Sequence, residues 1–82
     1  MSTYTLEDFK EDIKINREFE FIYKNKSYSL TFSKVGYIFT DIYANKHVVF
    51  KTYEDLLRDV KIQGKKIEEI IADKLYDDLS IY

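Results

Sequence analysis

The sequence has no cysteine, no proline and no tryptophan, and only two of its 82 residues are glycine. A chain without cysteine forms neither a disulfide nor a thiolate metal site, and it fits a reducing compartment. No apolar run approaches the roughly 18–20 residues that cross a bilayer. The first residues read MSTYTLEDFKED, which is acidic and amphipathic, unlike a secretory signal. We therefore expect a cytoplasmic protein with no membrane partner.

Aromatic residues dominate what is present. The chain is 45% hydrophobic and contains eight tyrosines and six phenylalanines. Buried aromatic side chains each remove a large area from water, so they suit a single small domain spanning residues 1–82. The net charge is only −2, so no strong field attracts nucleic acid or an anionic membrane.

Apolar and polar residues alternate through residues 18–51, which is the period of antiparallel strands joined by short turns. Turn-like breaks fall at residues 24–26, 34–36 and 44–46. This pattern predicts a four-stranded antiparallel meander, with strands at about 18–24, 27–33, 37–43 and 47–51.

Helices are predicted on both sides of the meander. Thr5 is a good N-cap for a helix over 5–15, and Asn16 is a plausible left-handed stop. Two further helices are expected at about 53–62 and 65–77, separated by Gly64. The tail at 79–82 alternates and can either add a short strand or fray. The predicted class is α+β, with the two C-terminal helices packed on one face of the sheet.

The first hairpin is predicted from its side-chain pattern. If Asn25 and Lys26 form a two-residue turn, Tyr23 pairs with Tyr28, Phe21 with Leu30 and Phe19 with Phe32. All six apolar side chains then share one face. A one-residue slip would destroy this agreement, so we expect the register to be strongly specified.

The second turn has two interpretations. A three-residue loop of Lys34, Val35 and Gly36 places Tyr37, Phe39 and Tyr43 on the face opposite the core. A two-residue turn of Val35 and Gly36 puts those aromatics into the core, with Asp41 among them. We prefer the three-residue loop, because β-branched valine disfavours a positive φ and because an unpaired carboxylate in the core is costly.

The sequence offers little for catalysis, and we predict no enzymatic activity, no cofactor and no metal site. His47 is the one histidine, and it flanks a turn with no neighbouring carboxylate or cysteine. The serines lack a nucleophile elbow. The two glycines are isolated, so they do not form a phosphate-binding loop.

The candidate site is the sheet face opposite the core. Exposed aromatic patches mark protein contacts, so Tyr37, Phe39 and Tyr43 are predicted to bind a protein partner or a second copy of the chain. Lysines on turns at one end of the sheet form a basic rim: Lys24, Lys26 and Lys46. The alternative is single-stranded nucleic acid, with bases stacked on the aromatics and phosphates on the lysines. Either edge strand could also pair with another chain.

Two segments carry a resemblance, EFEFIYKNKSYSLTF and EDLLRDVKIQGKKIEEII. They resemble small uncharacterised proteins of low-GC Gram-positive bacteria and their phages, in which similar pieces read EFxYNGKxY and IxGKxLxEI. Lys26 departs from the usual turn glycine. The shared motifs are a turn, a helix cap and an apolar stripe, so the resemblance assigns no functional residue. It implies an accessory or mobile-element protein.

Overall fold

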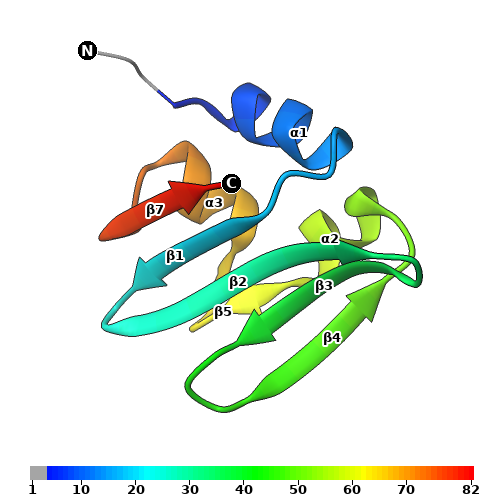
Figure 1. Cartoon of the computed structure of the whole chain (residues 1–82). Helices are drawn as coiled ribbons and strands as arrows, with labels where there is room; N and C mark the ends of the chain where they lie inside the picture. The colour runs from blue at the N-terminus through cyan, green and yellow to red at the C-terminus, as the bar shows by residue number, and fades with distance from the viewer. Residues whose placement is uncertain (1–3) are drawn as a thin grey trace.

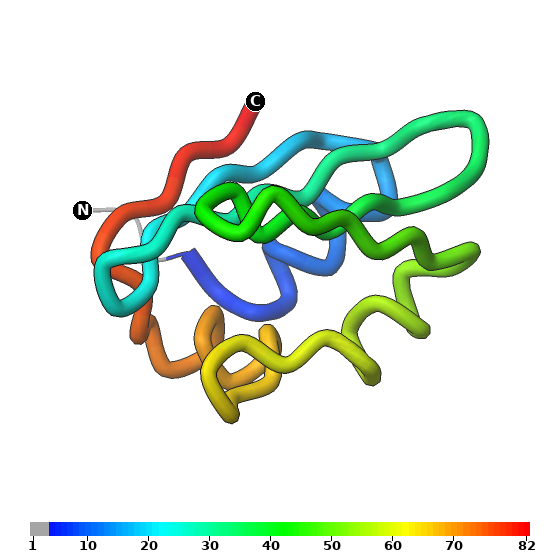
Figure 2. Tube along the Cα trace, turned by 90° about the horizontal axis from the view of Figure 1, so that it is seen from below, coloured from blue at the N-terminus to red at the C-terminus, as the bar shows by residue number. Residues whose placement is uncertain are grey.

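The computed structural model describes residues 4–82, so residues 1–3 of the predicted domain lie outside it. The fold is α+β with an antiparallel sheet, which confirms the predicted class. Three helices lie on one side of the main sheet, and the other side is uncovered in this part of the chain (Figures 1 and 2). The elements in chain order are α1 (Leu6–Lys14), β1 (Phe19–Tyr23), β2 (Lys26–Ser33), β3 (Gly36–Asp41), β4 (Lys46–Phe50), α2 (Tyr53–Asp59), β5 (Lys61–Ile62), β6 (Lys65–Lys66), α3 (Ile67–Ala72) and β7 (Asp78–Ile81).

The first helix begins and ends through local hydrogen bonds. The side chain of Thr5 accepts from the backbone N–H of Asp8, and the Asp8 carboxylate accepts from the N–H of Thr5. This reciprocal pair is a capping box. At the other end Asn16 adopts φ 63°, as predicted, and so reverses the chain toward β1. Phe9 and Ile13 point from this helix into the core.

The main sheet has five strands in the order β4-β3-β2-β1-β7. The fifth strand comes from the C-terminal tail, which pairs antiparallel with β1 and sets Leu79 opposite Phe21. The tail is therefore a strand and does not fray. The core lies between the sheet and the helices, and its fully buried members include Phe9, Phe19, Phe21 and three isoleucines of α3.

The predicted register of the first hairpin is wrong by two residues. Phe21 lies opposite Tyr28 and Phe19 opposite Leu30, so the turn consists of Lys24 and Asn25. Both turn residues have positive φ, 49° and 67°, as a type I′ turn requires. A shift of two keeps every side chain on its own face, so the predicted core face of β1 is unaffected.

The preferred interpretation of the second turn is also wrong. Ser33 lies opposite Gly36, so Lys34 and Val35 form a two-residue turn. Gly36 has φ 132°, and a Cβ there would lie 2.3 Å from the carbonyl oxygen of Phe50. Phe50 lies in β4, farther along the chain, and its carbonyl oxygen leaves room only for glycine at position 36. This contact favours the turn in which Gly36 is a strand residue. Phe39 then lies opposite Leu30 and enters the core.

The third strand ends at Asp41, two residues before the predicted end, because its carboxylate caps the following loop. Asp41 Oδ1 accepts from the N–H of Ala44 at 3.0 Å. Asp41 lies on the helix-side face at the end of its strand and is only half-buried. Its carboxylate is thus satisfied without entering the core. Residues 42–45 form the loop, and β4 starts at Lys46.

The two C-terminal helices are shorter than predicted. The second one ends at Asp59, because Val60 turns extended and the chain enters the β5–β6 hairpin, which buries Ile62. That hairpin takes up Lys65 and Lys66, so α3 begins at Ile67. It ends at Ala72, since Lys74 adopts φ 52° and the N–H of Leu75 returns to the carbonyl of Ile70. This is a Schellman stop.

Candidate functional site: a free sheet edge

The three predicted contact aromatics do not form one surface. Phe39 is only 8% exposed and stacks on Tyr28, with ring centroids 5.8 Å apart. Tyr37 is on the same face and half-buried, its ring edge-on to Phe32. Tyr43 stands in the loop after β3 and is 81% exposed. The predicted aromatic patch is therefore dispersed between the core and a loop.

The predicted basic rim is partly assembled at the end of the sheet that holds Tyr43. The ammonium of Lys26 lies 5.6 Å from the centre of the Tyr43 ring. That of Lys24 lies 5.3 Å from the ring of Tyr23. Both are cation–π distances. Lys46 lies opposite Asp41 at the start of β4. Each lysine thus has a neighbour within the chain.

The remaining polar groups have structural roles in the described residues. His47 Nδ1 lies 2.9 Å from the hydroxyl oxygen of Thr40 and is exposed. Residues 4–82 contain no group of three or more histidine, aspartate or glutamate side chains arranged to hold a metal ion. Nor does any helix in this range reach the length and apolarity needed to cross a membrane.

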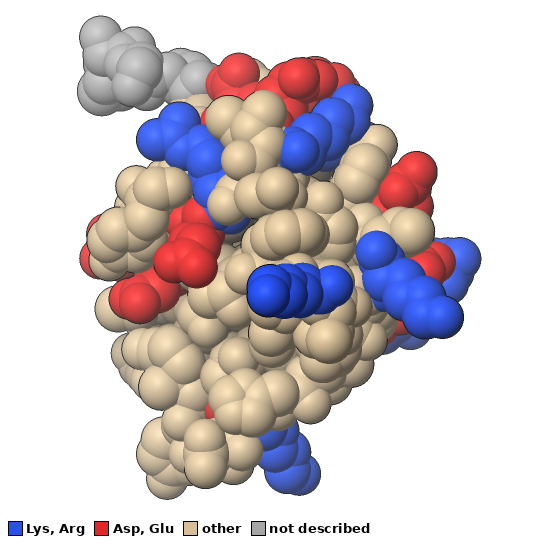
Figure 3. Space-filling view, turned by 45° about the vertical axis from the view of Figure 1, so that its right-hand side comes forward, with Lys and Arg blue, Asp and Glu red and all other residues tan. Residues whose placement is uncertain are grey.

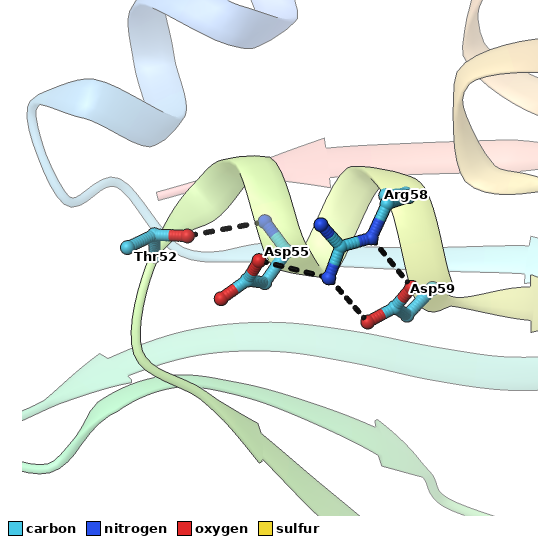
Figure 4. Close-up of polar contacts among 4 residues, drawn as sticks. All are labelled: Thr52, Asp55, Arg58 and Asp59. Atoms are coloured by element: carbon cyan, nitrogen blue, oxygen red, sulfur yellow. Dashed lines mark hydrogen bonds and ion pairs between the residues drawn. The ribbon is translucent and has the colours of Figure 1, made fainter.

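Charged side chains along α2 pair with one another. Thr52 caps the helix by accepting from the N–H of Asp55, and Arg58 binds the carboxylates of Asp55 and Asp59 (Figure 4). The hydrogen bond from Arg58 lowers the pKa of Asp59 below its usual value; desolvation opposes this shift, and the positive charge of Arg58 adds to it. These charged side chains therefore bind one another within α2.

Strand β4 is an edge strand with apolar side chains exposed on both faces. Val48 points to the helix side and is 50% exposed, and Val49 points to the uncovered face and is 49% exposed. Figure 1 shows β4 at the margin of the sheet. In the view turned toward that margin, uncharged residues fill most of the surface, one basic side chain crosses its centre, and the other charged side chains stand around it (Figure 3).

The outward backbone groups of β4 follow from the hydrogen-bond alternation. The N–H of Ile42 donates to the carbonyl of Ser27 at 3.1 Å. Every second residue before it, Thr40 and then Ile38, therefore also bonds to β2 through its backbone N–H and C=O. The residues between them bond to β4. Val48 lies opposite one of these, Phe39, and is therefore bonded inward. The N–H and C=O of His47 and Val49 point to the free edge.

A shallow groove runs beside β4 on the helix side. It is lined by Phe39, Val48, Phe50, Asp59, Val60 and Lys61. Helix α2 covers the core behind this groove but leaves the β4 side chains half open. The groove therefore continues the apolar surface of Val48 toward α2 and ends near one acidic and one basic residue.

Sequence reasoning noted that an edge could pair with another chain but did not single out these residues. The signal was present in the run His47–Phe50, where apolar side chains follow one another without alternation. A strand with one buried face alternates, so consecutive valines indicate a strand whose two faces are alike.

Searches of protein-family models, of curated proteins and of solved structures find no match to this chain.

Proposed function

We propose that this chain is a small, non-catalytic protein-binding module that acts by β-strand addition along β4. The observation that carries the proposal is the edge itself. Val48 and Val49 expose about half of their surface on opposite faces of one strand, and the backbone groups of His47 and Val49 point away from the sheet. In strand addition, backbone bonds supply affinity and side-chain contacts supply specificity.

Protective features of sheet edges are sparse along this strand. Natural proteins block edges with short strands, lysine and other charged side chains, proline, bulges or a covering element. The five residues of β4 pair with β3 without a bulge and contain no proline. Charge is confined to the ends, at Lys46 and Lys51. An available edge of this kind supports a contact function.

The charges around the edge favour a partner strand with an apolar centre and no cation opposite Lys46 or Lys51. Lys46 and Lys51 flank the valines. Opposite charges facing one another across strands contribute a few tenths of a kcal/mol up to about 1 kcal/mol, whereas like charges destabilise. A suitable partner therefore places neutral or acidic residues opposite the two lysines, and a probe peptide with glutamate at both ends meets this condition.

The proposal is tested by amide hydrogen exchange, read residue by residue in the ¹⁵N-labelled protein. The probe is the peptide acetyl-Glu-Val-Thr-Val-Thr-Glu-amide. The N–H groups of His47 and Val49 are expected to exchange slowly, either in the protein alone at high concentration or after the peptide is added. Fast exchange at both positions under every condition overturns the proposal.

The matched variants are Val49→Pro and Val48→Pro. The N–H of Val49 points outward, so proline there removes an edge donor without breaking the β3–β4 ladder. The N–H of Val48 bonds to β3, so Val48→Pro should detach β4. Val49→Pro is expected to abolish protection at His47 while Val48 and Phe50 stay protected. Retained protection at His47 contradicts strand addition.

A further inference from the structure

We infer that the strand added to β4 is β4 of a second copy, antiparallel to the first, with the two-fold axis beside Val48. This rests on the proposed function and names its partner. In a two-fold arrangement each residue contacts its counterpart reciprocally and the assembly closes on itself. Two five-stranded sheets would become one continuous sheet across the interface.

The outward backbone groups allow only a few symmetric registers. Residues that exchange both hydrogen bonds must come from the outward-pointing pair, His47 and Val49. The symmetric choices set His47 opposite His47, Val49 opposite Val49, or His47 opposite Val49 of the second copy. The last choice forms two such pairs, related by symmetry, and places Val48 opposite Val48 at the close, non-hydrogen-bonded position.

The charges favour that third register. It sets Lys46 opposite Phe50 of the second copy and Lys51 opposite Asn45, so no like charges meet. The Val49–Val49 register would instead set His47 opposite Lys51 and would form only one hydrogen-bonded pair from His47 and Val49. The His47–His47 register opposes two imidazoles and leaves Phe50 facing the loop at Ala44. Like charges placed directly opposite are destabilising.

A complementary contact lies on the helix side of the same register. Phe50 and Asp59 both line the groove beside β4. A lysine stem lying along Phe50 of the second copy therefore brings its ammonium toward the Asp59 carboxylate. The two grooves meet at the axis, where the half-exposed Val48 side chains cover one another. Apolar contact at the centre and opposite charges at the rim are typical of protein interfaces.

The other edge of the sheet is a poorer partner. The N–H of Leu79 in β7 already donates to the Asp78 carboxylate at 3.0 Å. Pairing of β4 with β7 of a second copy would also be a head-to-tail contact, which forms an open chain unless the rotation closes. The β4–β4 arrangement needs neither a broken local bond nor a special rotation.

The test uses a single introduced thiol, since the chain has no cysteine of its own. In the inferred register, Val48→Cys sets two thiols directly opposite one another. Val49→Cys sets them diagonally, beyond the Cα separation that a disulfide spans, roughly 7 Å. The native side chains are equally exposed, 50% and 49%, so random collision would cross-link both variants alike.

Covalent dimer on a non-reducing gel, under mild oxidation at micromolar protein, is expected at least about tenfold faster for Val48→Cys than for Val49→Cys. Faster cross-linking of Val49→Cys assigns the other register and overturns this one. Equal slow rates together with a monomeric mass by light scattering at high concentration overturn the second copy as partner. In that case peptide-dependent protection of His47 and Val49 still decides strand addition separately. Circular dichroism of both variants verifies folding.

Discussion

The two edges of the main sheet differ in how they are closed. At the β7 edge, the strand packs Leu79 and Ile81 against the core, the N–H of Leu79 is bonded to Asp78, and Arg17 Nε donates to the carbonyl of Tyr82. At the β4 edge, two valines are half exposed and the outward groups have no such local bond in the residues described. The β7 edge is closed by bonds within its own chain, and the β4 edge has no comparable bonds in residues 4–82.

Under the proposed function, stability and contact belong to separate parts of one small sheet. Helices α1 and α3 lie behind the β1 side, where burial alternates strictly along the strand. The β4 side receives only α2, and four of its five residues are exposed. Substitutions on the two sides should therefore act on different measurable quantities.

The largest contrast is between Phe21→Ala and Val48→Ala. Phe21 is fully buried and stacks on Tyr28 at 5.5 Å, so its truncation should cost about 3–5 kcal/mol of unfolding free energy. Val48 is half exposed, and its truncation should cost under about 1 kcal/mol. Urea unfolding of dilute protein measures both. Similar losses for the two variants would contradict the division between the sides.

Gly36→Ala should loosen β4 specifically. The added Cβ meets the Phe50 carbonyl oxygen at 2.3 Å, and φ is 132°, so overlap and strain together should cost at least about 2 kcal/mol. The control is Gly64→Ala, with φ 86° and no atom within 4 Å, where strain alone should cost about 1 kcal/mol. Equal losses of unfolding free energy in the two variants would mean that the close approach of the Phe50 carbonyl to Gly36 does not affect stability. Denaturant midpoints with matched slopes decide this.

Tyr4→Phe should weaken the polar contacts that link Tyr4, Asp12 and Arg17 beside the β7 edge. The Tyr4 hydroxyl donates to Asp12 Oδ2 at 2.7 Å, and Asp12 also lies near Arg17. Its loss should cost about 1 kcal/mol at pH 7.

The same tyrosine predicts a pH dependence. Partial burial, the hydrogen bond to Asp12 and nearby negative charge raise the pKa of Tyr4 above its ordinary value. A folded pKa above the unfolded value, about 10, gives stability that is complete below pH 10 and is lost as the pH rises above it. Tyr4→Phe should lose less stability than the parent between neutral and strongly alkaline pH. Identical alkaline slopes in thermal melts of the two proteins would contradict this.

The smallest effect is expected for Asp78→Ala. Removing the carboxylate frees the N–H of Leu79, which can then bond to water, so the unfolding free energy should change by under about 0.5 kcal/mol. Amide exchange at Leu79 should accelerate, and this edge should come to resemble β4. Unchanged exchange at Leu79 would show that the local bond does not protect the edge.

The sequence predicts the faces of the first hairpin but not its register. Period-two alternation assigns Phe19, Phe21 and Tyr23 to the core, and the structure buries all three. The same alternation is preserved by a shift of two residues, so it could not locate the turn at Lys24 and Asn25. Each candidate turn, Lys24-Asn25 or Asn25-Lys26, places one lysine at a positive φ, which is uncommon. Turn chemistry therefore could not choose between them.

The parity of the second hairpin depends on a distant contact. The local preference that puts Gly36 in the loop rests on β-branched Val35, which disfavours a positive φ, and on keeping the Asp41 carboxylate out of the core. In the structure Gly36 is the first residue of β3, where the Phe50 carbonyl leaves no room for a side chain. Local preferences do not contain that contact. The three-residue loop would place Phe39 on the uncovered face, whereas the structure buries it. The exposed apolar side chains are instead those of β4, on both of its faces.

The pairing of β1 with β7 sets an order of assembly. Strands β1 to β4 meet their neighbours through short connections, whereas β7 reaches β1 only after the rest of the chain has crossed behind the sheet. Contacts between residues distant in sequence form late, because loop-closure entropy must be overcome first. The meander can therefore form while one flank of β1 is still open. During that interval β1, like β4, is an edge strand with one unpaired side, and early refolding is the stage at which aggregation is most sensitive to protein concentration.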